Sequence, residues 1–130
     1  MKFIASALAR QRDFTLLLDA VRGGNMPALV TGLSGVHKAA VLYALWLQTG
    51  KRVFLLAGDE SEAARFVSDL SAMGMRALFY PARDFSFRQA ETASHEYEHQ
   101  RLQVLERLLS GACDAVVACA DGALQDTVPP

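Results

Sequence analysis

Residues 31–40 have the outline of a phosphate-binding loop but lack two of the groups on which the chemistry of that loop depends. A working loop has a glycine, four further residues, a Gly-Lys pair and then a serine or threonine. Gly32 and Lys38 keep this spacing, whereas His37 stands at the second glycine and Ala39 stands at the hydroxyl that would bind magnesium. We therefore interpret the segment as a degenerate phosphate loop.

The two replacements remove different parts of nucleotide binding. A phosphate cradle combines inward-facing backbone N–H groups, a lysine ammonium and a hydroxyl on Mg²⁺ at a helix N-terminus. Ala39 has no atom that can bind a metal ion, and the side chain of His37 would occupy space that the phosphates need. We expect no bound nucleotide, with Gly32 and Gly35 forming only a turn. The alternative is a weak P-loop ATPase that uses Lys38 and a non-standard metal ligand.

The sequence around the loop predicts strands that alternate with helices. Apolar runs predict four strands, at 28–31, 52–57, 77–80 and 114–119. Helical spacing and glycine stops predict helices at 3–22, 37–49, 60–73 and 95–110, and a last helical turn at 121–126. Asp59 with Glu62 forms a capping box for the third helix, and Ser94 is predicted to cap the fourth.

This alternation predicts an α/β fold with a three-layer parallel sheet and helices on both faces. Ligands of such folds bind at the carboxyl ends of the strands, where the degenerate loop would lie. Asp59 also follows a strand, but without a hydroxyl at Ala39 we interpret it as a helix cap rather than a magnesium ligand.

The composition limits the possible functions. The chain has 130 residues, of which 52% are hydrophobic and 21% charged, so it suffices for one folded domain. A net charge of −1 gives no global basic field for nucleic acid. No signal peptide or membrane span is evident, so we expect a cytoplasmic protein without a membrane partner. Cys113 and Cys119 are expected to be buried, reduced thiols.

Three further groups of residues are weaker candidates for a site. Arg83, Phe85 and Arg88 mix basic and aromatic side chains, which suits single-stranded nucleic acid, although an inter-domain contact or loop anchoring fits two arginines better. Arg101 is either an anchor for the 81–93 segment or a neighbouring domain, or a solvated arginine on a helix face. His95 and His99 have the spacing of metal ligands on a helix, but no third ligand is evident, and we predict no metal site.

From Gly32 onward, several stretches together resemble the N-terminal region of bacterial transcription-repair coupling factors. They are TGLSGVHKAA at the loop, VFLLAGDESEAARFVSDL, FYPARD, HQRLQVLERL and DAVVAC, in that order. That region is itself similar to the first domain of the B protein of excinuclease ABC, which has an intact nucleotide loop. His37 and Ala39 depart from the intact loop, which favours the coupling factors over the excinuclease B protein.

The resemblance implies a degenerate P-loop NTPase or helicase-like fold over 27–130, preceded by an N-terminal helix and connector over 1–26. It implies a non-catalytic scaffold domain of a transcription-coupled DNA-repair translocase, which supports recruitment of nucleotide excision repair to stalled RNA polymerase. The A protein of excinuclease ABC and RNA polymerase would bind downstream domains, while a motor elsewhere in the parent would bind DNA, ATP and magnesium. The Pro-Pro end suggests a fragment; the alternatives are a helicase fragment and a standalone interaction module.

Overall fold

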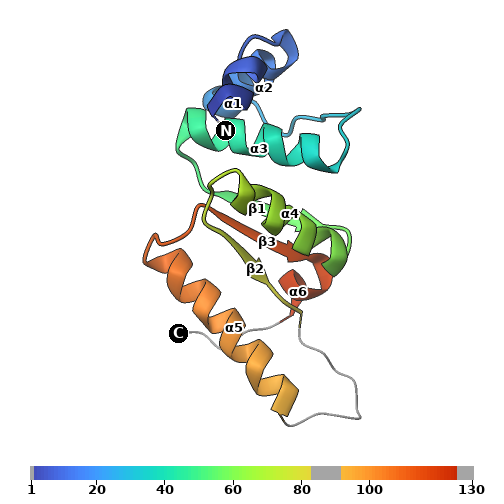
Figure 1. Ribbon diagram of the computed structural model, residues 1–130, viewed down its shortest axis with the longest axis vertical. Coiled ribbons are helices and arrows are strands. Elements are labelled where there is room, and N and C mark those ends of the chain that lie inside the picture. Colours follow the sequence, from blue (N-terminus) through green and yellow to red (C-terminus); the bar gives the residue numbers. More distant parts are fainter. Residues whose placement is uncertain (1, 83–91, 126–130) are drawn as a thin grey trace.

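The structure is a computed structural model that describes residues 2–82 and 92–125, with side chains from residue 96 onward in the second range. Within these ranges helices and strands alternate from the third helix onward, as Figure 1 shows. The elements are α1 (Lys2–Leu8), α2 (Arg12–Gly23), α3 (Gly35–Thr49), β1 (Val53–Ala57), α4 (Glu60–Ala72), β2 (Ala77–Tyr80), α5 (Thr92–Leu109), β3 (Ala115–Cys119) and α6 (Ala120–Leu124).

The strands form a parallel three-stranded sheet in the order β1-β3-β2. In the register, Leu55 of β1 and Phe79 of β2 both lie beside Val117 of β3. All five residues of β3 are buried, which explains why this strand is a continuous apolar run without alternation. The prediction of an α/β fold with a parallel sheet is therefore confirmed.

The two faces of the sheet carry different helices. On one face Leu55, Phe79 and Val117 pack in one hydrophobic cluster with α4, which contributes Ala63, Phe66 and Leu70. On the opposite face Val116 and Leu78 pack with Val104 and Leu108 of α5. The sheet thus lies between α4 and α5, as predicted. The helix α3 packs against α4, and α1 and α2 pack against α3 (Figure 1).

The predicted first strand is wrong. Residues 25–31 form no strand, and Leu29 is 90% exposed. An apolar run becomes a strand only where a neighbouring strand can pair with it, and in the described part of the chain this one has none. A P-loop NTPase needs a strand before the loop, so the described residues do not confirm that particular fold.

Helix ends are shifted by up to three residues from the predicted ones, and two of the helix predictions are wrong in detail. The first helix, predicted over 3–22, is interrupted at residues 9–11 and forms two helices, because a periodic apolar pattern does not show where the chain bends. Ser94 lies inside α5, which begins at Thr92, so the predicted cap is wrong. The predicted N-cap of α4 is confirmed, since Asp59 accepts a 2.7 Å bond from the Glu62 N–H. Glu62 reaches back toward the cap, but it accepts its 2.8 Å bond from the N–H of Gly58, one residue before the N-cap.

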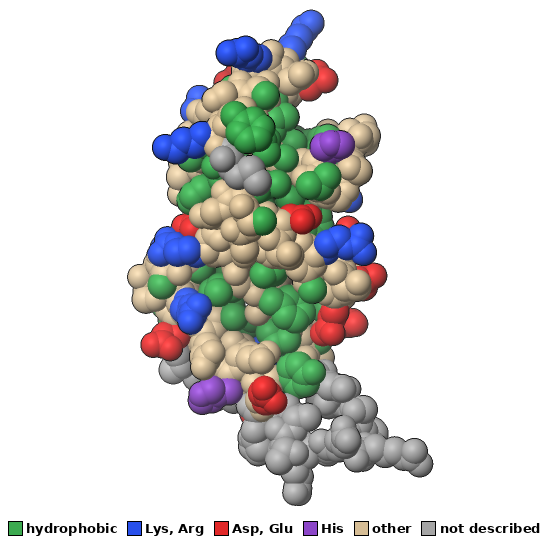
Figure 2. Space-filling view, viewed as in Figure 1, with side chains coloured by type: hydrophobic (Ala, Val, Ile, Leu, Met, Phe, Trp, Pro, Cys, Tyr) green, Lys and Arg blue, Asp and Glu red, His purple; other side chains and the backbone are tan. Residues whose placement is uncertain are grey.

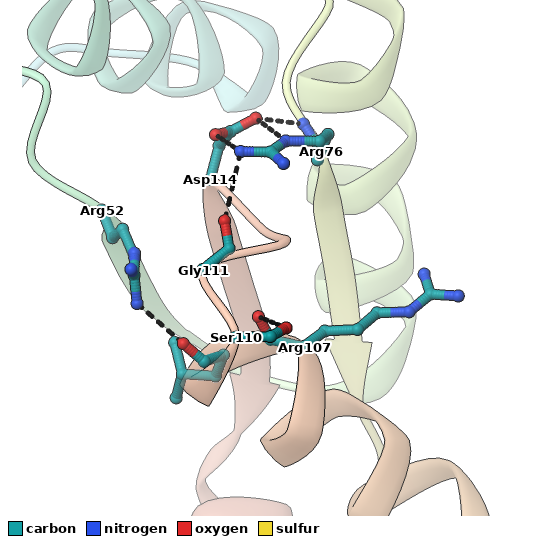
Figure 3. A network of polar contacts seen from close by, with 7 residues as sticks. Arg52, Arg76, Arg107, Ser110, Gly111 and Asp114 are labelled. Carbon is teal, nitrogen blue, oxygen red and sulfur yellow. Dashed lines mark hydrogen bonds and ion pairs between the residues drawn. The ribbon is translucent and has the colours of Figure 1, made fainter.

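An ion pair joins β2 and β3 at the end of the sheet where these strands begin (Figure 3). One carboxylate oxygen of Asp114 accepts bonds from the backbone N–H and the Nε of Arg76, at 2.8 and 3.0 Å. The other oxygen accepts a 2.8 Å bond from Nη2 of Arg76. The side chain of Asp114 is only 12% exposed, and hydrogen bonding to Arg76 lowers its pKa below the ordinary value.

This lowered pKa predicts a dependence of stability on pH. A carboxylate whose pKa is lower in the folded state stabilises the fold above its unfolded pKa of about 3.9, and this contribution is lost as the pH falls through the folded pKa. We expect Asp114→Ala to destabilise the chain by about 1 kcal/mol at neutral pH, because it removes the hydrogen bonds between Asp114 and Arg76, while water can solvate the exposed guanidinium. Urea unfolding at pH values from 7 down to 2 measures this effect.

Asp19→Ala removes an exposed carboxylate on α2 and is the matched control. Asp114→Ala should flatten the acid part of the stability curve, and Asp19→Ala should not. If stability depends equally on acid pH in the unsubstituted 130-residue chain and in Asp114→Ala, this account of the ion pair is contradicted.

Candidate functional site

The degenerate loop lies immediately before α3. Gly32 has a φ of 79°, a left-handed conformation that favours glycine, and Ser34 is the N-cap of a helix that begins at Gly35. Gly32 therefore lies at a bend before α3, and Gly35 is the first residue of that helix. Since no strand precedes this turn in the described residues, the loop is not presented at the end of a strand as it is in nucleotide-binding α/β proteins.

Ala39 is part of the hydrophobic core. It is fully buried and belongs to the same cluster as Tyr43, Ala63 and Phe66. A serine or threonine at this position would place its hydroxyl among apolar side chains, where an unpaired hydroxyl is destabilising. The position that would bind magnesium in an intact loop contributes to packing in this chain.

Lys38 and His37 are both engaged with neighbouring side chains. The ammonium of Lys38 lies 3.9 Å from a carboxylate oxygen of Glu62 at the start of α4. Both side chains are about half exposed, so the pair contributes less than about 1 kcal/mol to stability. Nδ1 of His37 lies 2.8 Å from Oγ of Ser34, so that hydroxyl is paired with the imidazole rather than with a backbone N–H of α3.

Arg101 is the most buried polar residue described, with no exposed surface. Its Nη1 donates to the carbonyls of Pro81 and Gly122, at 2.8 and 2.9 Å, and its Nη2 donates to the carbonyl of Gln125 at 2.8 Å. The guanidinium also lies 4.2 Å from the centre of the Tyr80 ring. The interpretation of Arg101 as a solvated arginine is wrong.

These contacts place Arg101 at the carboxyl ends of β2 and β3. Pro81 directly follows β2, and Gly122 lies in α6, which directly follows β3. This is the edge where ligands bind in parallel α/β folds. Here Arg101 itself donates hydrogen bonds to the carbonyls at that edge, and so joins α5 to α6.

Gly122 is a residue of this site that sequence reasoning missed. A Cβ atom at this position would lie 3.1 Å from the backbone nitrogen of Ala82 and 3.2 Å from the carbonyl oxygen of Tyr80. A side chain here would require the backbone at Tyr80–Ala82 to shift by a few tenths of an ångström, so glycine suits this close approach, which also brings the Gly122 carbonyl to Arg101. The pair Asp121-Gly122, a common turn signal, marked the position in the sequence.

The remaining sequence candidates do not add to this site. Arg83, Phe85 and Arg88 lie outside the described residues, as does the side chain of His95. His99 is exposed on α5. In the described part of the chain, no three His, Cys, Asp or Glu side chains are grouped so that they could hold a metal ion. The helices of that part include none that is long and apolar enough to span a membrane.

Comparison with known proteins identifies a longer relative. The chain is 29% identical to the transcription-repair-coupling factor of Bacillus subtilis (strain 168), over 132 aligned positions that cover 100% of this chain. The chain is similar to a transcription-repair coupling factor over its whole length. This confirms the predicted resemblance, although the chain spans only 11% of the length of that relative. No protein-family model and no solved structure matches the chain.

The burial of Arg101 predicts a large effect on stability. Arg101→Met keeps most of the side-chain volume but leaves three carbonyls without their donors, so we expect a loss of at least about 3 kcal/mol. Arg101→Lys should recover only part of this loss, because one ammonium cannot reproduce the fork of a guanidinium. Urea unfolding followed by circular dichroism measures both.

Arg107→Met is the matched control on the same helix, because Arg107 is exposed. It should change the free energy of unfolding by less than about 0.5 kcal/mol. The assignment of Arg101 as an internal anchor is wrong if Arg101→Met and Arg107→Met are equally stable.

Proposed function

We propose that this chain is a non-catalytic scaffold domain of a transcription-coupled DNA-repair translocase. Its similarity to the B. subtilis coupling factor over all 130 residues carries the proposal. On this proposal the domain supports a neighbouring module that recruits nucleotide excision repair, through the A protein of excinuclease ABC, to stalled RNA polymerase. ATP, magnesium and DNA would bind to the motor of the longer parent.

Three features of the degenerate loop support a role without nucleotide chemistry. Ala39 is committed to the core, Lys38 faces Glu62, and the His37 ring is paired with Ser34. A phosphate group approaching Lys38 would have to compete with the carboxylate of Glu62 and would be repelled by it. The residues that remain from the loop therefore support the start of α3 and its contact with α4.

The distribution of charge supports a role in which this domain does not itself hold DNA. Lysine and arginine side chains are spread over the face shown in Figure 2 and are interspersed with acidic ones. With a net charge of −1, the chain has no excess of cations for binding phosphates by counterion release. Contact with DNA is therefore assigned to the motor of the parent.

The first test is a titration with nucleotide. We expect isothermal titration of the chain with Mg-ATP or Mg-ADP to show no binding at micromolar concentration, because the cradle lacks its metal ligand and its lysine is paired. Lys38→Ala should leave this result unchanged, and Lys51→Ala is the control for non-specific attraction. Magnesium-dependent micromolar binding that Lys38→Ala abolishes and Lys51→Ala retains would refute the proposal in favour of an ATPase.

The second test uses the B. subtilis relative. Deleting the stretch that matches this chain should reduce repair of transcribed strands in cells without abolishing ATP hydrolysis by the purified remainder. Strand-specific repair assays measure the first effect, and a steady-state ATPase assay measures the second. Normal repair after the deletion, or complete loss of hydrolysis, would be inconsistent with a non-catalytic supporting domain.

A further inference from the structure

The strand β1 has an open edge. In the described part of the chain it pairs only with β3. The N–H of Val53 donates to the carbonyl of Asp114, next to β3, at 2.9 Å. Because successive residues of a strand direct their backbone groups to opposite edges, Phe54 and Leu56 direct theirs away from the sheet. Their N–H and C=O groups are available to a further strand.

The side chains of the same two residues are also uncovered. Phe54 is 60% exposed and Leu56 is 56% exposed, whereas their neighbours in the register, Val116 and Ala118, are buried. Phe54 lies in the same row of the sheet as Val116 and Leu78, which α5 covers. The apolar face of the sheet therefore continues onto β1, but the described helices cover it only over β2 and β3.

A row of leucines on α5 borders this uncovered face. Leu102, Leu105 and Leu109 line a shallow hollow on α5, and Leu109 is 73% exposed. Arg107 lies on the β2 side of α5 in Figure 3. Leu105 and Leu109 are each two residues from Arg107, or about 200° around the helix, so they lie on the side nearer β1. The uncovered face of β1 and the leucine row of α5 beside it are therefore both apolar.

Nothing in the sequence of β1 protects its edge. The strand reads Val-Phe-Leu-Leu-Ala, without a charged residue, a proline or a glycine. Proteins usually block a permanently exposed edge with a charged residue, a proline or a bulge, because an open apolar edge pairs with other chains. A β1 edge that is covered in the complete protein accounts for this sequence.

We propose that β1 pairs with one further β-strand, apolar at alternate positions, from a part of the same polypeptide outside these 130 residues. This inference rests on the proposed function, because it takes the chain to be part of a longer protein. The length of the relative supports it, since only 11% of that protein matches this chain. The strand would cover Phe54 and Leu56 and lie beside the leucine row of α5.

A second copy of the chain is a poorer fit to this edge. Figure 1 shows α3, and beyond it α1 and α2, on the β1 side of the sheet. Twofold pairing through β1 would bring two such sets of helices into the same space. A single strand needs a spacing of only about 4.8 Å from β1.

Hydrogen exchange followed by NMR tests the proposal in the 130-residue chain and in the longer polypeptide from its own reading frame. In the 130-residue chain the amides of Phe54 and Leu56 should exchange faster than that of Leu55. In the longer polypeptide they should slow by about tenfold or more, as expected for a new hydrogen bond with added burial. Equally fast exchange in both would overturn the proposal.

A double variant provides a second readout. Phe54→Ser with Leu56→Ser should leave the midpoint of urea unfolding nearly unchanged in the 130-residue chain, where both side chains are exposed, and lower it clearly in the longer polypeptide. Phe3→Ser with Leu29→Ser, at positions 72% and 90% exposed, is the control and should act alike in both. An equal effect of the β1 variant in both proteins would contradict the added strand.

Other outcomes identify other occupants and overturn the proposal. A concentration-dependent dimer of the 130-residue chain that the β1 variant abolishes assigns the edge to a second copy. Slow exchange of Phe54 and Leu56 in the 130-residue chain, together with residues 28–31, assigns it to that segment. A reading frame that ends with this chain removes the basis of both proposals, whereas unprotected β1 amides in the longer protein overturn only this one. Nucleotide binding refutes the proposed function but not the added strand.

Discussion

The described structure depends on keeping β3 buried along its whole length. This strand pairs on both edges and is covered on both faces, so its five residues contribute no polar side chain to the surface. The two polar residues that are buried in the described part lie at its two ends. Asp114 joins its start to β2 through Arg76, and Arg101 holds the helix that follows it. Both charges are paired or hydrogen-bonded, which is the condition for burying them.

The residues of the loop before α3 contact the rest of the fold. Gly32 has a left-handed backbone conformation, and α3 begins three residues later. Ala39 faces the core, and Lys38 faces a carboxylate at the start of α4. Positions 38 and 39 therefore connect α3 to α4. The proposed scaffold role is consistent with this packing.

The sequence predicted the elements well where neighbouring residues alone determine the local structure. Continuous apolar runs indicate the three parallel strands β1, β2 and β3, and Asp59 with Glu62 indicates a helix start through local hydrogen bonds. Residues 28–31 have the same apolar character, yet their pairing depends on a partner strand that local sequence does not reveal. For the same reason the helical spacing around Arg101 could not show that its side chain is enclosed by carbonyls from elements 20 or more residues away.

The part of the sheet formed by β2 and β3 differs from β1 in how far its apolar face is covered. Over β2 and β3 the apolar side chains pack against α5, and Arg101 of α5 donates to the carbonyls of Pro81 and Gly122 just beyond the two strands, so this face of the sheet is covered. Over β1 the same apolar row continues without cover. A sheet whose central strand is saturated can extend only at its edges. Because β1 has unused backbone groups beside exposed Phe54 and Leu56, it is the edge at which added polypeptide would gain both hydrogen bonds and buried area.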